Sequence, residues 1–223
     1  MDVLTNLQAV TAKIRLAAAA CGRSEKDVTL VAVSKMHETE EILPLLQAGH
    51  RVFGENRVQE AMRKFPALKE QFPDLKLHLI GGLQTNKVKE VVSFFDVIES
   101  VDRIELAEKL AAEMKKQGRN LPCFIQVNTG EEPQKSGIVP RETISLVKQC
   151  RDLGLNIVGL MCIPPVDDEP SPHFAFLKKL AREADVKELS MGMSDDYDIA
   201  VQQGATFVRV GTALFGERDY SKK

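Results

Sequence analysis

From about residue 28 onward, the chain alternates short apolar runs with amphipathic helical stripes, and this alternation restricts the possible folds more than any other feature. The runs are rich in Val, Ile, Leu and Phe, as are strands buried on both faces of a parallel sheet. They are Val28 to Val33, Arg51 to Phe53, Leu77 to Ile80, Asp96 to Ile98, Cys123 to Val127, Ile157 to Met161, Glu188 to Ser190 and Phe207 to Val210. The pattern predicts repeated strand–helix units.

About eight such units in 223 residues favour an α/β fold, a single (β/α)8 TIM barrel, because open doubly wound sheets more often use fewer strands. An additional N-terminal helix is predicted over residues 4 to 21. Its apolar stripe is Leu7, Val10, Ile14, Ala17 and Cys21. The last helix, after Leu214, is short, so we expect the leading helix to cover the surface left bare there. No linker-like segment divides the chain, and residues 1–223 are predicted to form one domain.

Composition excludes several classes of protein. The chain has 43% hydrophobic and 28% charged residues, and its formal charge of −2 comes from scattered groups, which argues against nucleic acid or a membrane as a partner. The four cysteines lie outside any metal-ligand spacing, so they are interpreted as reduced residues and no metal site is predicted. No signal-like start or membrane-spanning apolar stretch is found, and we expect a cytoplasmic protein.

Polar residues and glycines follow nearly every apolar run. The loops after the strands build the binding site of a parallel barrel, so we expect these residues to gather on one rim. They are Ser34-Lys35, Gly54-Glu55-Asn56, Gly81 to Lys87, Asn128-Thr129-Gly130, Pro164-Pro165, Met191 to Asp196 and Gly211-Thr212. The candidate site is predicted at this rim.

Lys35 is the most distinctive residue of the rim. At the inner end of the run Leu30 to Ser34 it would be enclosed by apolar side chains. Desolvation and a neighbouring cation both favour the neutral amine, the form that attacks an aldehyde. The alternative is a lysine whose ammonium group extends from the strand end into solvent.

The loops after the seventh and eighth runs supply a second signal. Ser194 is predicted to begin a helix, and Gly211-Thr212 opens the final turn, so hydroxyl and backbone N–H groups converge where barrels commonly bind phosphate. Taken singly, Ser194 could be a helix cap and Gly211 a tight turn. Two such loops in neighbouring units favour phosphate.

Three further side chains are considered: Arg209 and Asn56 each have two interpretations, and His78 has a structural one. Arg209 should share a strand face with Phe207 and Gly211, so it points either at a ligand inside the barrel or at a carboxylate outside it. Asn56 could bind a ligand hydroxyl or cap the following helix. His78 is interpreted as a structural histidine, not as a catalytic base.

Taken together, these segments resemble the pyridoxal-phosphate homeostasis proteins, small single-domain relatives of the alanine racemase barrel. The resemblance covers nearly the whole chain. It is carried by Val31 to Lys35, Phe53 to Asn56, Val58-Gln59-Glu60, His78 to Gly81, Leu83 to Lys87, Gln126-Val127-Asn128, Lys135-Ser136-Gly137, Gly159-Leu160-Met161, Leu189 to Ser194, Val208 to Thr212 and Phe215-Gly216. The chain departs from the family pattern at Met36-His37-Glu38, Arg57 and Leu77.

The resemblance implies fold type III binding of pyridoxal 5′-phosphate (PLP), held covalently as a Schiff base on Lys35. It also implies that Ser194 and Gly211-Thr212 contact the phosphate and that Arg209 lies near the pyridine nitrogen. The remaining residues of the implied pocket are Asn56 and Met191.

Two functions are compatible with this cofactor. One is a non-catalytic protein of PLP homeostasis that stores PLP, delivers it and limits the free aldehyde; the other is a PLP-dependent amino-acid racemase. Racemases of this barrel need an opposing base, usually a tyrosine from a second domain and a partner subunit. Neither of the two tyrosines, Tyr197 and Tyr220, is evidently placed across from Lys35.

Arg209 would also keep the pyridine ring unprotonated and so weaken carbanion stabilisation. We therefore predict PLP binding without racemase activity. A third interpretation, a sugar-phosphate or nucleotide enzyme, predicts a colourless protein. The resemblance further suggests a monomer that makes transient contact with PLP-dependent apoenzymes; the sequence does not indicate which they are, nor whether Lys87 or Lys135 assists transfer.

Overall fold

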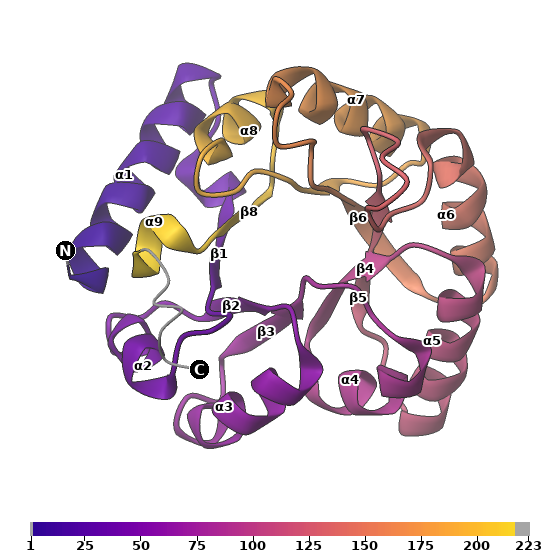
Figure 1. Ribbon diagram of the computed structural model, residues 1–223, viewed down its shortest axis with the longest axis horizontal. Helices are drawn as coiled ribbons and strands as arrows, with labels where there is room; N and C mark the ends of the chain where they lie inside the picture. Colours follow the sequence, from indigo (N-terminus) through magenta and orange to yellow (C-terminus); the bar gives the residue numbers. More distant parts are fainter. Residues whose placement is uncertain (1, 217–223) are drawn as a thin grey trace.

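In the computed structural model, which describes residues 2–216, eight parallel strands form a closed barrel in the order of the sequence (Figure 1). Strand β1 pairs with both β2 and β8, which closes the sheet. The strands are β1 (Thr29–Val33), β2 (Val52–Glu55), β3 (Lys76–Leu79), β4 (Val97–Val101), β5 (Pro122–Val127), β6 (Asn156–Cys162), β7 (Glu188–Ser190) and β8 (Phe207–Val210). The predicted (β/α)8 barrel is confirmed.

Helices follow the strands and surround the barrel (Figure 1). Each main helix buries an apolar stripe against the sheet; α5, for example, buries Leu106, Leu110 and Met114 and ends at Gly118 in a left-handed conformation. The helices are α2 (Thr39–Gln47), α3 (Val58–Gln71), α4 (Val88–Phe94), α5 (Ile104–Gln117), α6 (Thr143–Asp152), α7 (Pro170–Glu183), α8 (Tyr197–Gln203) and α9 (Thr212–Phe215). Among the described helices, none combines the length and apolarity needed to cross a bilayer.

The predicted N-terminal helix is also present, as α1 (Val3–Ala20). It buries Val10, Ile14, Ala17 and Ala18 against α2, α8 and α9 (Figure 1). Because α9 has only four residues, it leaves part of the barrel wall uncovered, and α1 fills that place. The amide of Asn6 donates to the Leu214 carbonyl at 2.8 Å, which joins α1 directly to α9.

The inside of the barrel holds both aromatic and charged side chains. Phe207 of β8 contacts the rings of His78 on β3 and Phe124 on β5, with centroids 5.7 and 5.5 Å apart. These strands are not neighbours in the sheet, so their side chains meet across the interior. Residues two apart on a strand share a face, and Arg209 therefore points inward with Phe207.

Candidate functional site

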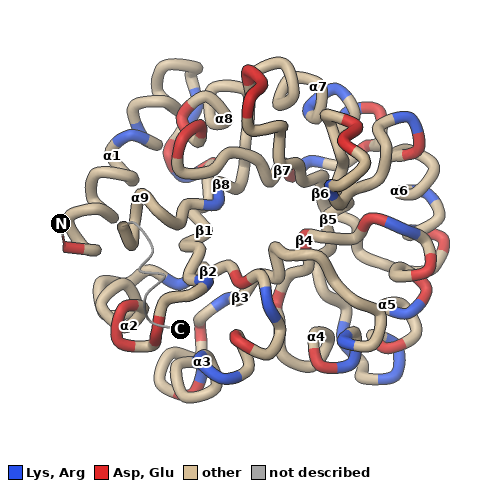
Figure 2. Tube along the Cα trace, viewed as in Figure 1, with Lys and Arg blue, Asp and Glu red and all other residues tan. Residues whose placement is uncertain are grey.

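The outside of the barrel shows no concentration of one charge. Figure 2 shows acidic and basic positions spread over the helices and loops, with few on the strands. Among residues 2–216 no cluster of histidine, cysteine and carboxylate side chains is arranged to hold a metal ion. The candidate chemistry is therefore sought at the strand ends and inside the barrel.

Lys35 lies just beyond β1, in a turn closed by a hydrogen bond of 3.1 Å from the His37 N–H to the Ser34 carbonyl. Its side chain is partly buried. The next residue, Met36, has a φ of 66°, a left-handed conformation that is unfavourable for a long side chain. The turn is thus held in a conformation that its own sequence does not prefer.

The turn also contacts the end of the barrel wall formed by β8 and α9. The His37 ring stacks on Phe215, with centroids 4.4 Å apart and planes 20° from parallel. On the neighbouring strand, a Cβ on Gly211 would lie 3.3 Å from the Val33 carbonyl oxygen, so the loop after β8 passes close to the end of β1. The segments carrying Lys35 and Gly211 therefore lie side by side at the rim.

The loop after β7 is joined to the same place. The Ser194 hydroxyl oxygen accepts hydrogen bonds from the backbone N–H groups of Gly211, at 3.3 Å, and Ala213, at 3.2 Å. Ser194 thus neither begins nor caps its own helix, and that prediction was wrong: α8 begins at Tyr197. A turn closed by the Met193 N–H on the Asp196 carboxylate, at 2.6 Å, delays the helix by three residues.

The other predicted rim residues have distinct environments. Met191 is fully buried just after β7, whereas Thr212 is exposed at the start of α9. Asn56 is partly buried after β2, and α3 has no side-chain cap, so Asn56 does not cap it. The Asn56 backbone packs on Gly81, where a Cβ would lie 2.4 Å from the Asn56 carbonyl oxygen; only glycine permits this approach.

Arg209 is buried inside the barrel, so the alternative of an ion pair on the outside was wrong. Its Nη1 donates to the Ser190 hydroxyl at 2.6 Å and its Nη2 to the Cys162 carbonyl at 2.8 Å. Ser190 in turn donates to Glu99 at 2.5 Å, and the other Glu99 oxygen lies 2.6 Å from Nδ1 of His78. The interpretation of His78 as a structural histidine agrees with this network.

Glu99 is the central carboxylate of that network and is completely buried. Burial raises the pKa of Glu99, but the hydrogen bond from His78 and the charges of His78 and Arg209 lower it by more, so the pKa lies below the ordinary value. Glu99 therefore stays ionised and balances the guanidinium charge of Arg209. Sequence reasoning missed this residue, although a glutamate in the middle of the apolar run Val97–Val101 was a usable signal.

A second network, also missed, lies behind the Lys35 turn. Lys64 of α3 extends its amine to the Ser34 carbonyl and to the carboxylates of Glu55 and Glu60, at 2.7 to 2.8 Å. The available signal was a lysine beside Phe65 on the apolar stripe of α3, where solvated charges are not expected.

The loop after β5 is folded onto its neighbours. The Asn128 amide bonds both backbone groups of Glu132, at 2.8 and 3.2 Å. Lys135 pairs with the Glu132 carboxylate at 2.6 Å and donates to the Pro164 carbonyl at 3.3 Å. Lys135 thus links two loops of the rim.

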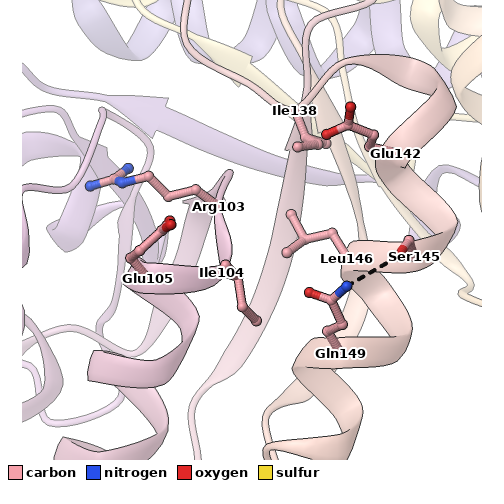
Figure 3. Close-up of a pocket in the computed structure, with 8 residues that line it drawn as sticks. All are labelled: Arg103, Ile104, Glu105, Ile138, Glu142, Ser145, Leu146 and Gln149. Carbon is pink, nitrogen blue, oxygen red and sulfur yellow. Dashed lines mark hydrogen bonds between the residues drawn. The ribbon is translucent and has the colours of Figure 1, made fainter.

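A separate cavity of about 370 Å³ lies between α5 and α6 (Figure 3). Arg103, Ile104 and Glu105 line one wall, and the opposite wall includes Leu146 and Gln149 of α6. None of the predicted cofactor residues lines it, so the rim remains the candidate site.

Comparison with known sequences identifies relatives over the whole chain. The sequence profile of the alanine racemase N-terminal domain matches residues 5–219. A pyridoxal phosphate homeostasis protein of Vibrio cholerae is 42% identical, with 99% of this chain and 98% of the relative aligned.

Solved structures similar to this one also align over nearly the whole chain. An unknown protein of Bifidobacterium adolescentis superimposes with a TM-score of 0.90 and 34% identity, over 96% of this chain and 94% of that one. PipY of Synechococcus elongatus, solved with PLP bound, gives a TM-score of 0.79 and 40% identity, over 91% of this chain and 100% of PipY.

Proposed function

The chain belongs to the pyridoxal phosphate homeostasis proteins of the alanine racemase N-terminal domain family, and from this premise we propose that it binds PLP at the barrel rim through Lys35. PLP presents an aldehyde, a phosphate and a pyridine ring. The proposal is carried by one observation: the turns holding Lys35, Ser194 and Gly211 lie together at the ends of β1, β7 and β8. The PLP-bound structure of PipY supports it.

Lys35 is assigned the covalent bond. Its neutral amine adds to the aldehyde carbon, a C=N bond forms and one water molecule leaves. Lys35 is partly buried in the turn after β1. Because water can hydrolyse the C=N bond again, the aldehyde is held reversibly, as its storage and delivery require.

Ser194 and the Gly211 turn are assigned to the phosphate. A serine hydroxyl has one donor hydrogen and two acceptor lone pairs. The Ser194 oxygen accepts two backbone N–H groups, so its own hydrogen remains to be donated. Among the described residues no acceptor for that hydrogen lies within hydrogen-bond range, and a phosphate oxygen fits this place. Thr212, exposed beside it, supplies a second hydroxyl.

Arg209, Asn56 and Met191 complete the proposed pocket. Only two of the five N–H groups of Arg209 are bonded within the described residues, which leaves donors for the pyridine nitrogen. A guanidinium does not give up its proton to the ring, so the ring stays a weak electron sink. Asn56 has an amide without a bond to the described residues, suited to a ligand hydroxyl, and Met191 supplies apolar wall.

We further propose that the protein does not catalyse racemisation. Tyr197 is buried beneath α1, with the Lys13 amine 5.0 Å from its ring centroid, and so faces the helical shell. Tyr220 lies outside the described residues. The position of Tyr197 favours a protein of PLP homeostasis, in which Lys35 holds an aldehyde and no tyrosine of residues 2–216 stands opposite it.

The first test is chemical trapping. Borohydride reduction of the purified, PLP-loaded protein followed by peptide mapping should give a pyridoxyl adduct on Lys35. The Lys35→Ala variant should keep its far-ultraviolet circular dichroism and lose the visible absorption band. An adduct on Lys87 or Lys135 in place of Lys35 contradicts the assignment. Multiple turnovers of alanine racemisation that Lys35→Ala abolishes would show an enzyme instead.

A further inference from the structure

The buried cation Lys64 contacts the turn that carries Lys35, and the proposed function makes no use of it. Its side chain is completely buried. Its amine donates to the Ser34 carbonyl at 2.8 Å and to the His37 carbonyl at 3.1 Å. These two carbonyls stand on either side of Lys35, so one ammonium group fastens both ends of the turn.

Two carboxylates complete the attachment. Glu60 accepts the Lys64 amine at 2.8 Å and the Met36 N–H at 2.6 Å through the same oxygen. Glu55 accepts the Lys64 amine at 2.7 Å and the Ser34 hydroxyl at 2.6 Å. The backbone groups of the turn are thus bonded to two side chains of α3, and Glu55 of β2 bonds the Ser34 hydroxyl and the Lys64 amine.

This arrangement acts against the local preference of the turn. Met36 has a φ of 66°, which a methionine adopts only when its surroundings impose it. Burying a lysine is costly unless every donor is bonded, and apolar residues of the same size would pack more cheaply. The Lys64 cluster is therefore better explained by the position it imposes on the turn than by stability alone.

We propose that Lys64 is a positioning residue which, together with Glu60, holds the turn so that the Lys35 amine meets the ligand aldehyde. The proposal rests on the assignment of Lys35 to PLP. It predicts that loss of Lys64 weakens the covalent step and spares the contacts to the phosphate, which come from β7 and β8.

Two ligands separate these effects in the full-length chain. PLP can condense with Lys35, whereas pyridoxine 5′-phosphate carries an alcohol in place of the aldehyde and cannot. Lys64→Met should lower the affinity for PLP on the order of tenfold, because a misplaced amine condenses with the aldehyde less favourably. The affinity for pyridoxine 5′-phosphate should not change. Equal weakening of both ligands, or of neither, overturns the proposal.

Lys69→Met is the matched control. Lys69 lies on the same helix and donates to the Phe94 carbonyl at 2.7 Å and the Asp96 carboxylate at 2.8 Å, away from the Lys35 turn. Its replacement removes a comparable set of bonds and should leave both affinities unchanged. A selective loss of PLP affinity in Lys69→Met would show that the effect is not specific to the turn.

The position of the turn can also be tested without any ligand, by hydrogen exchange of its backbone amides. Hydrogen exchange of the Met36 amide should be faster in Lys64→Met and in Glu60→Ala than in the wild type or in Lys69→Met. Glu60→Ala also carries the affinity test if Lys64→Met does not fold, because Glu60 is partly exposed and its loss leaves Lys64 paired with Glu55. If hydrogen exchange of the Met36 amide is unchanged in Glu60→Ala, then Lys64 and Glu60 do not hold the turn and the proposal is refuted. If the wild type gives no pyridoxyl adduct on Lys35, only the proposed function is refuted.

Discussion

At the scale of single residues, the interior depends on two buried charges of opposite sign, Glu99 and Arg209, joined through the Ser190 hydroxyl. An ion pair in a low-dielectric interior repays its desolvation only when its hydrogen bonds are complete. Both Glu99 oxygens are bonded, one to His78 and one to Ser190. Removing the carboxylate would leave the guanidinium charge buried without compensation.

Glu99→Gln should therefore lower the free energy of unfolding by about 3 kcal/mol near neutral pH. The pKa of Glu99 is below the ordinary glutamate value of 4.5 in the folded chain, so the unfolded state takes up the proton first as the pH falls. The stabilisation is complete above the ordinary value and is lost as the pH falls through the folded pKa.

Urea unfolding of wild type and Glu99→Gln at a series of acidic pH values measures the contribution of Glu99 to the free energy of unfolding. The difference in unfolding free energy should shrink as the pH falls, and a difference that is constant with pH would contradict the argument. Glu108→Gln, at an exposed position of α5, should match the wild type throughout.

Sequence reasoning located the residues whose role follows from their position after an apolar run. It missed the residues whose role depends on partners elsewhere in the chain. Lys35 and Gly211 stand directly after apolar runs, so periodicity places them at the rim. Lys64 and Glu99 lie within elements, and one partner of each is distant: Ser34 is 30 residues from Lys64, and Ser190 is 91 residues from Glu99. A single sequence gives no measure of such pairings.

At the scale of elements, strands were predicted more accurately than helix ends. The start of β7 and the end of β8 agree with the prediction, because apolar runs bounded by polar residues have clear limits. Strand β4 continues three residues past its predicted end at Ile98, because Glu99 and Ser100, although polar, are buried strand residues. The start of α8 was misplaced because Ser194 bonds to another loop.

The short helix α8 depends on a residue that precedes the barrel. Arg23, just after α1, donates to the Val201 carbonyl at 2.7 Å and the Ala205 carbonyl at 2.8 Å. Carbonyls at the end of a helix lack partners within the helix. A cation there also interacts favourably with the negative end of the helix dipole. Arg23 thus attaches the C-terminal end of α8 to the segment that leads into β1.

Arg23→Ala should lower the free energy of unfolding by roughly 2 kcal/mol, the usual contribution of hydrogen bonds from a charged donor. Arg23→Lys should lose less, because a lysine keeps the charge and can reach one carbonyl. Arg15→Ala, an exposed position on α1, should have little effect. Urea denaturation measures all three, and equal losses in Arg23→Ala and Arg15→Ala would exclude the capping role.

At the scale of the whole molecule, a closed barrel has no free strand edges within the described residues. Closure removes strand edges as a surface for association, and the monomer expected from the sequence stays a prediction. Light scattering of the purified protein tests that expectation, and a stable dimer would correct it.

Packing of the strands and of α6 also protects three of the four thiols. Cys123, Cys150 and Cys162 are buried, and burial raises the pKa of each to about 12, whereas Cys21 is exposed after α1. Because the thiolate is the reactive form, iodoacetamide should label the native protein at Cys21 alone and the urea-unfolded protein at all four cysteines. Peptide mass spectrometry reports each site separately. Cys162 lies between the Arg209 network and the β6 end, so its labelling in the native chain would show that the barrel opens beside the proposed cofactor pocket.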